Sequence, residues 1–294
     1  MGFAWWARQR ARSGTNEMGA PTRPGLLVAV AGLHVVALAQ GTPAPLHQQT
    51  SVLCEDGAAL SAVLWGGGAD ARGYLRGARV ALIDEQGRAV WNGFDASLHP
   101  WQLAAGRFAG HQVLMVGVRK TTVLDAIERP RPFIYSIRAG ARGLRKVWLG
   151  SALSRPYLSA CFGNLDGLAE DELVALELTR TGEPALGAYK WEGFGVEGIA
   201  RSAPIANGRA LHCSDVWPGA GEEAVVLSVA GPLWQFTALQ PAGERLAPVA
   251  RVSATVGGQG AEWRLRPRGP SGPGAVRLAR GGFTRELPFR PLCP

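Results

Sequence analysis

Short apolar runs and glycine-rich polar turns alternate along most of the chain, and this alternation repeats. Five stretches each read as a strand, a polar turn and a second strand, at residues 50–67, 99–117, 155–177, 209–229 and 261–279. Corresponding turn positions lie 57 residues apart between Arg107 and Asn164 and 51 apart between Asn164 and Asp215. This period is typical of propeller blades. The pattern therefore predicts an all-β chain built from repeats.

Two further strands follow in each of the first four copies, at 79–84 and 88–94, 132–138 and 144–150, 187–193 and 196–202, and 233–239 and 246–252. A blade needs four antiparallel strands, because a single four-stranded sheet covers neither face until neighbouring sheets stack on it. We therefore expect a β-propeller of about five four-stranded blades. The last copy holds only three strands, so it is expected to be short or to be completed by the N-terminal region. A sandwich or a split pair of sheets is the alternative.

Residues 1–39 have the features of a leader. Arg23 precedes an apolar run of fourteen residues at 26–39, and Ala37 and Ala39 form an A-x-A cleavage signal. A helix of that length spans only about 21 Å, too short for a hydrocarbon core of about 30 Å, so a signal peptide is favoured over an uncleaved anchor. Residues 1–17 match no part of such a signal, which points to Met18 as an alternative start. We expect a periplasmic or secreted protein with one domain at 40–294 and no membrane span after cleavage.

The four cysteines lack the close pairing of a zinc site. In an oxidising compartment such residues are typically disulfide partners, and four of them allow three connectivities. We favour Cys161 with Cys213, which lie in the innermost strands of successive repeats. Cys54 with Cys293 would then join the two ends of the chain.

Charge and motifs exclude some classes of function. The chain carries 31 basic and 23 acidic side chains, and its net charge of +8 comes from arginines scattered singly among apolar residues. That distribution is typical of a solvated surface and not of a nucleic-acid track, so no nucleic-acid partner is expected. The motifs G-x-S-x-G, H-E-x-x-H and G-x-x-x-x-G-K are all absent.

The third copy contains GNLDGLAEDELVALE, residues 163–177. This stretch resembles the D-x-D-G-D-G-x-x-E-L-V core of FG-GAP or VCBS-type repeats. Four further pieces, at 116–122, 129–137, 147–156 and 189–200, are similar in order to a subgroup of bacterial FG-GAP repeat proteins. The resemblance implies an integrin-alpha-type β-propeller scaffold, often extracellular, and implies no particular reaction.

The same loop would hold calcium in such a repeat. It would offer oxygens at positions one, three and five, a backbone carbonyl at seven and a carboxylate at nine. Asn164, Asp166 and Glu172 occupy positions one, three and nine, but Leu168 stands at position five. We therefore expect a metal-free turn in which Asn164 and Asp166 hydrogen-bond to nearby backbone. No cofactor is expected, and calcium binding is the less favoured alternative.

Strand order points to one functional face. In a propeller the second-to-third-strand loops and the crossovers between blades emerge on the same side, which groups Lys120, Arg131, Arg155 and His99. Arginine offers a planar fork suited to carboxylate or phosphate. We therefore expect a non-catalytic, monomeric binding or scaffolding module, and not an enzyme, whose partner is a cell-envelope protein or an anionic polymer.

A secreted hydrolase of glycoside or ester type, using the central channel, is the alternative function. Its acids would be drawn from Asp166, Asp171 and Glu172. Neighbouring residues of a strand face opposite ways, however, and the resemblance to a cation loop explains the spacing of these acids better.

Overall fold

The computed structural model describes residues 46–69, 75–122, 125–141, 143–150, 153, 155–256, 262–269, 272–280 and 283–292. The predicted leader at 1–39 lies outside these residues. Strands dominate the described part, and helix is confined there to the short 3-10 turns η2 (Ala96–Leu98) and η3 (Ala139–Ala141). No described helix is long and apolar enough to cross a membrane. The all-β expectation is thus confirmed.

Four antiparallel groups of four strands, here called blades 1 to 4, each follow chain order; blades 1 and 2 are separate sheets, whereas one parallel bridge between β14 and β18 joins blades 3 and 4 into a nine-stranded sheet that also includes β22. Blade 1 contains β1 (Leu46–Leu53), β2 (Ala59–Trp65), β5 (Arg79–Ile83) and β6 (Ala89–Trp91), with the two-residue ladder of β3 (Gly68–Ala69) and β4 (Leu75–Arg76) beside it. Blade 2 contains β7 (Gln102–Phe108), β8 (His111–Thr122), β9 (Asp125–Ile137) and β10 (Leu144–Leu149). Blade 3 contains β11 (Tyr157–Gly163), β12 (Glu172–Leu178), β13 (Pro184–Trp191) and β14 (Val196–Arg201). Blade 4 contains β15 (Gly208–Ser214), β16 (Glu223–Ala230), β17 (Leu233–Ala242) and β18 (Arg245–Thr255).

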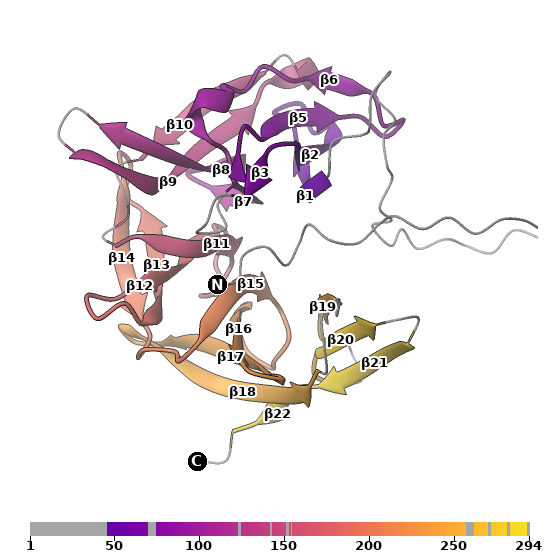
Figure 1. Ribbon diagram of the computed structural model, residues 1–294, viewed down its shortest axis with the longest axis vertical. Helices are drawn as coiled ribbons and strands as arrows, with labels where there is room; N and C mark the ends of the chain where they lie inside the picture. The colour runs from indigo at the N-terminus through magenta and orange to yellow at the C-terminus, as the bar shows by residue number, and fades with distance from the viewer. Residues whose placement is uncertain are drawn as a thin grey trace, which may run out of the picture.

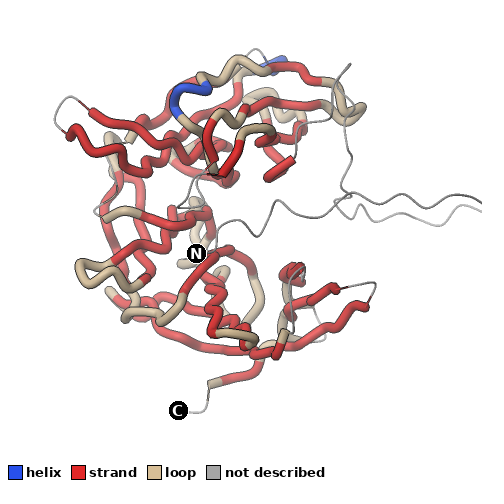
Figure 2. Tube along the Cα trace, in the orientation of Figure 1, coloured by secondary structure: helices blue, strands red, loops and turns tan. Residues whose placement is uncertain are grey.

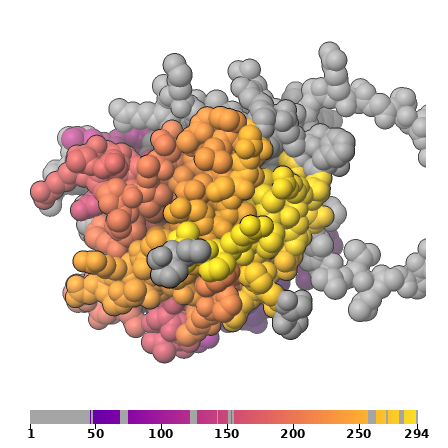
Figure 3. Space-filling view, turned by 90° about the horizontal axis from the view of Figure 1, so that it is seen from below, coloured from indigo at the N-terminus to yellow at the C-terminus, as the bar shows by residue number. Residues whose placement is uncertain are grey.

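The fifth group of strands is smaller. β19 (Glu262–Arg266), β20 (Ala275–Arg280) and β21 (Phe283–Pro288) form a three-stranded sheet. The short β22 (Arg290–Pro291) then pairs with β18 of blade 4, and Figure 3 shows this C-terminal segment lying across the surface of blade 4. The described residues therefore contain four complete blades, and the predicted fifth four-stranded blade is not confirmed.

The blades follow one another along an arc (Figure 1), and strands make up nearly all of it (Figure 2). The first strand of each blade lies toward the centre, where β1 contacts β7, β7 contacts β11 and β11 contacts β15. The last strands, β6, β10, β14 and β18, lie on the outside. This radial order of strands makes the fold propeller-like.

The core lies between stacked blades. β12 and β16 are buried along almost their whole length, which explains their unbroken apolar runs, since a strand covered on both faces need not alternate. Phe108 and Met115 of blade 2 belong to one buried cluster with Tyr157 and Phe162 of blade 3. A second buried cluster joins blades 3 and 4. Stacking between blades thus supplies the burial that a single sheet lacks.

Candidate functional site

Glutamine side chains join the inner strands of blades 1, 2 and 3. The Gln48 amide on β1 donates to the Leu103 carbonyl of β7 and accepts from the Leu103 N–H at 2.8 Å. One blade further on, Gln102 donates to the Ala160 carbonyl of β11 at 2.8 Å and accepts from the Ala160 N–H at 3.2 Å. In the described part of the chain, the inner strands of neighbouring blades are not paired through their backbones, and these side-chain amides supply hydrogen bonds between them instead.

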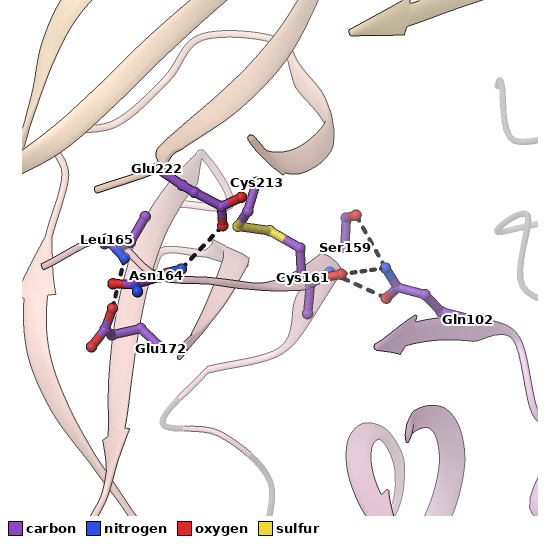
Figure 4. The surroundings of a disulfide bond; sticks show 9 residues. Gln102, Ser159, Cys161, Asn164, Leu165, Glu172, Cys213 and Glu222 are labelled. Atoms are coloured by element: carbon purple, nitrogen blue, oxygen red, sulfur yellow. Dashed lines mark hydrogen bonds between the residues drawn. A yellow bond between two sulfur atoms is a disulfide. The ribbon is translucent and has the colours of Figure 1, made fainter. Parts of the chain in front are cut away.

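The next inner junction is covalent. A disulfide joins Cys161 of β11 to Cys213 of β15, with a Cα–Cα distance of 6.0 Å (Figure 4). This pairing confirms the prediction from the sequence. Cys54 is buried and has no disulfide partner among the described residues, while Cys293 lies outside them. The predicted Cys54–Cys293 bridge therefore stays a prediction.

The turn that resembles a cation loop is hydrogen-bonded internally. Asp166 accepts from the Leu168 N–H at 2.8 Å, Glu172 accepts from the Leu165 N–H at 2.8 Å, and the Asn164 amide donates to the Leu168 carbonyl. Leu168 itself is 61% exposed. The bonds of Asn164 and Asp166 are those of the expected turn, and the absence of a metal there remains a prediction.

Two carboxylates bridge neighbouring blades at equivalent positions of the repeat. Asp171 donates its N–H to the Arg107 carbonyl at 2.8 Å, and its Oδ2 accepts from the Arg107 N–H at 2.6 Å. Glu222 does the same with Asn164, at 2.7 Å and 3.1 Å (Figure 4). Asp171 therefore spans blades 2 and 3, and Glu222 spans blades 3 and 4, at the ends of the inner strands.

Both bridging carboxylates are half-buried, and their second oxygens, Asp171 Oδ1 and Glu222 Oε1, accept no hydrogen bond from the described residues. Burial raises the pKa of Asp171 above its ordinary value, opposed by the bond from Arg107. Burial also raises the pKa of Glu222, and the charge of Asp171 raises it further. The charge of Asp171 thus acts on the Glu222 carboxyl across the junction between the blades.

Two more carboxylates, Glu172 and Glu223, follow directly in the sequence and turn inward. They are 1% and 0% exposed, and each holds its own turn by accepting backbone N–H bonds. Burial is again the main cause that raises their pKa values. Together with the bridging pair, four carboxylates with raised pKa values lie at one end of blades 3 and 4.

We expect these four carboxyls to contribute more stability as the pH falls toward about 5, close above the ordinary pKa of a carboxyl. Burial lowers the pKa of His212, so that residue acts in the opposite direction as the pH falls below its ordinary pKa. A group whose pKa is raised by folding holds its proton more tightly in the folded state. Its contribution to the free energy of unfolding is therefore full below the unfolded pKa and is lost as pH rises through the folded pKa. Thermal unfolding at constant ionic strength measures this dependence.

Carboxyls with lowered pKa values act in another pH range. For Asp56, Asp84 and Asp95 hydrogen bonds are the main cause of the lowering, so their contribution is lost only as the pH falls through values below the ordinary one. The double variant D171N/E222Q should have a flatter profile between about pH 5 and 8. An identical slope in the variant would contradict the assignment.

The residues predicted to form one cationic face have different surroundings. Lys120 is exposed, with its ammonium 6.0 Å from the centre of the Phe133 ring. Arg131, on β9, is only 4% exposed, and its Nε donates to the Lys120 carbonyl at 3.2 Å. Arg131 is thus not on an exposed face. His99 ends η2 with φ 48°, and its Nδ1 is buried without a hydrogen-bond partner in the described part of the chain.

Arg155 lies apart from the other three. It lines a pocket over blade 3 with Arg180 and Arg201, neither of which was singled out from the sequence. No hydrogen bond or ion pair joins it to Lys120, Arg131 or His99 within the described ranges.

Sequence reasoning considered Asp171 but missed Glu222. It compared Asp171 only with acids in the same turn, whereas the residue at the equivalent position of the next repeat, Glu222, lies in blade 4. The repeat alignment carried the signal, since Asp171 and Glu222 are 51 residues apart, as are Asn164 and Asp215. Because adjacent blades stack, residues one repeat apart in the sequence, such as Asp171 and Glu222, lie on neighbouring blades.

Comparisons with known proteins find a likeness in structure but none in sequence. No family model matches the chain, and no curated protein is similar to it in sequence. Among solved structures, an endo-arabinase from Bacteroides thetaiotaomicron is similar, with a TM-score of 0.40 and 9% identity, over 84% of this chain and 93% of that one. The FG-GAP or VCBS resemblance is not shown by any of these comparisons.

The structural likeness contradicts the expectation that the protein is not an enzyme, because the similar structure is that of an endo-arabinase. That expectation rested on the absence of linear catalytic motifs, and acids brought together by blade stacking leave no such motif.

Proposed function

We propose that the protein is an exported hydrolase of glycosidic bonds, with Asp171 and Glu222 as its pair of carboxylates. The observation that supports this is the pair itself: two half-buried carboxylates from adjacent blades, each with one oxygen held by backbone and one without a described partner. Glycoside hydrolysis requires two carboxyl groups on either side of the bond, one to donate a proton and one to attack or to activate water.

The surroundings of Glu222 and Asp171 differ, and this difference indicates which carboxyl is the general acid and which is the base or nucleophile. Glu222 has its pKa raised by burial and by the charges of Asp171 and Asp215, which favours the protonated form that a general acid needs. Asp171 has the lower ordinary pKa, and the N–H and charge of Arg107 oppose the effect of burial on it. We therefore assign Glu222 as the general acid and Asp171 as the base or nucleophile.

Export is part of the proposal. The predicted signal peptide and the Cys161–Cys213 disulfide both fit an oxidising compartment. A polysaccharide of the cell envelope or of the surroundings is the substrate class that such a location offers. This class includes the anionic polymer considered as a partner from the sequence.

The test compares the wild type with D171N and E222Q on a panel of aryl glycosides and polysaccharides, arabinan included. Each isosteric change should lower kcat about 10²- to 10⁴-fold, because it removes a proton-transfer group. The E222Q variant should also lose the alkaline limb of the pH–rate profile, which reports the general acid. Glu192→Gln is the matched control, an exposed carboxylate on the turn after β13 at the same end of blade 3.

A purely structural role makes a different prediction. If the two carboxylates only hold blades together, D171N and E222Q should lower the melting temperature and leave the activity per folded molecule unchanged. That result, or no turnover of any panel member by the wild type, would contradict the proposed function.

A further inference from the structure

A pocket of about 420 Å³ lies at the end of blade 3 opposite to the bridging carboxylates. The residues that matter here are Arg155, Thr179, Arg180, Thr181, Arg201 and Ser202. Strand order explains the separation from the acid pair. Arg155 precedes β11, the threonines and Arg180 lie in the turn after β12, and Arg201 and Ser202 end β14, whereas Asp171 lies beyond the far end of β11.

One of the three guanidinium groups is held in place. Arg201 Nη1 lies 2.7 Å from Glu177 Oε2, and its Nη2 donates to the Tyr189 hydroxyl at 3.2 Å. Glu177 is 0% exposed, so its charge is directed to Arg201 and away from solvent. This single carboxylate offsets one of the three positive charges around the pocket.

Arg155 and Arg180 carry the remaining positive charge. Neither makes an ion pair or a hydrogen bond with any residue that the structure describes. Glu183 lies in the same turn and accepts from the Thr181 hydroxyl at 3.1 Å, but no ion pair joins it to either arginine in the described part of the chain, and no acidic residue is among the described residues that line the pocket. Two uncompensated guanidinium groups in one concave site create a positive potential that attracts anions.

The backbone fixes the spacing of these two arginines. The Leu178 N–H donates to the Pro156 carbonyl at 2.8 Å, which binds the turn carrying Arg180 to the segment carrying Arg155. Within the turn, the hydroxyls of Thr179 and Thr181 lie 2.8 Å apart. A turn held in this way presents its cation with little loss of entropy on binding.

We propose that this pocket binds an oxyanion, phosphate or carboxylate, carried on a sugar-sized molecule. The planar fork of arginine matches both groups by bidentate hydrogen bonding. The volume is at the lower end of the range of about 300–1,000 Å³ found for small-molecule sites. The hydroxyls of Thr181 and Ser202 also line the pocket, where they donate to Glu183 at 3.1 Å and to the Ala203 carbonyl at 2.7 Å. This site is independent of the proposed hydrolysis, because it lies at the other end of the blade.

The experiment measures binding of three probes by titration calorimetry at constant ionic strength: inorganic phosphate, galacturonic acid and neutral galactose. We expect at least one anionic probe to bind and galactose not to. Arg155→Gln and Arg180→Gln should each weaken the anion at least tenfold, which corresponds to about 1.4 kcal/mol, within the range for a hydrogen bond to a charged group. Arg251→Gln, at an exposed arginine of β18, is the matched control and should bind as the wild type does.

The outcomes distinguish a phosphate site, a carboxylate site and the absence of anion binding. Binding of phosphate alone assigns a phosphate site, and binding of galacturonic acid alone assigns a carboxylate site. No anion binding, equal weakening in Arg251→Gln, or unchanged affinity in both pocket variants overturns the proposal. Arg180 lies in an exposed turn, so its variant keeps the fold if Arg155→Gln does not. The D171N/E222Q variant should retain full anion affinity, which keeps this result apart from the test of catalysis.

Discussion

Removal of the Cys161–Cys213 disulfide is expected to lower the free energy of unfolding by about 4 kcal/mol. The bond closes a loop with a sequence separation of 52 residues, and a cross-link of that span removes chain entropy worth about 4 kcal/mol from the unfolded state. For a chain of this size the melting temperature should fall by roughly 10 °C. Thermal unfolding of the double variant C161A/C213A against the oxidised wild type measures the effect.

Reduction provides the matched control. Dithiothreitol should lower the melting temperature of the wild type to that of C161A/C213A. A further fall of the double variant under reduction would report the second predicted bridge, Cys54–Cys293. Equal stability of the oxidised wild type and the double variant would show that the inner junction is held by the blades alone.

Glu223→Ala is expected to destabilise the fold by about 3–6 kcal/mol. The Glu223 carboxylate accepts the backbone N–H groups of Val216 and Trp217 at 2.7 Å and 2.8 Å, and also accepts from the Gln240 amide. Its removal leaves three donors in a buried site without a partner, and each costs about 1–3 kcal/mol. Denaturant unfolding, with the midpoint and the slope both fitted, is the measurement.

Blade 3 offers a comparison at the equivalent position. Glu172 accepts from Leu165, but Lys190 stands where blade 4 has Gln240, and it pairs with Asp166 at 3.8 Å instead. Glu172→Ala should therefore cost less than Glu223→Ala. A larger loss in the Glu172 variant would mean that the number of donors does not determine the cost.

The strands of blades 1 to 4 could be predicted from the sequence because each is a local pattern. Apolar runs such as 172–178 and 223–230, bounded by glycine turns, specify strands without knowledge of their neighbours. The disulfide followed from the same repeat, since its two cysteines occupy matching strands. A fifth complete blade was not confirmed, because the last copy contains too few strands to build one in the described residues.

Burial and proximity between blades could not be predicted. The sequence predicts an exposed cation at Arg131, beside a proline, yet this residue of β9 is buried. The charge of Asp171 acts on Glu222 because the blades stack. Arg155 and Arg180 line the same pocket because the turn after β12 is hydrogen-bonded to the segment before β11. These contacts depend on how sheets are placed relative to one another, which a single-sequence pattern does not encode.

Blades 3 and 4 are fixed to each other at both ends of a radius. The disulfide joins their inner strands, and the parallel bridge between Arg201 and Arg245 joins β14 to β18 on the outside. Two sheets that are joined at both their inner and their outer strands cannot rotate about either junction alone. The junctions between blades 1 and 2 and between blades 2 and 3 have the glutamine amides of Gln48 and Gln102 at their inner edges. We therefore expect blades 3 and 4, which carry Asp171 and Glu222, to move less relative to each other than the blades at the other two junctions.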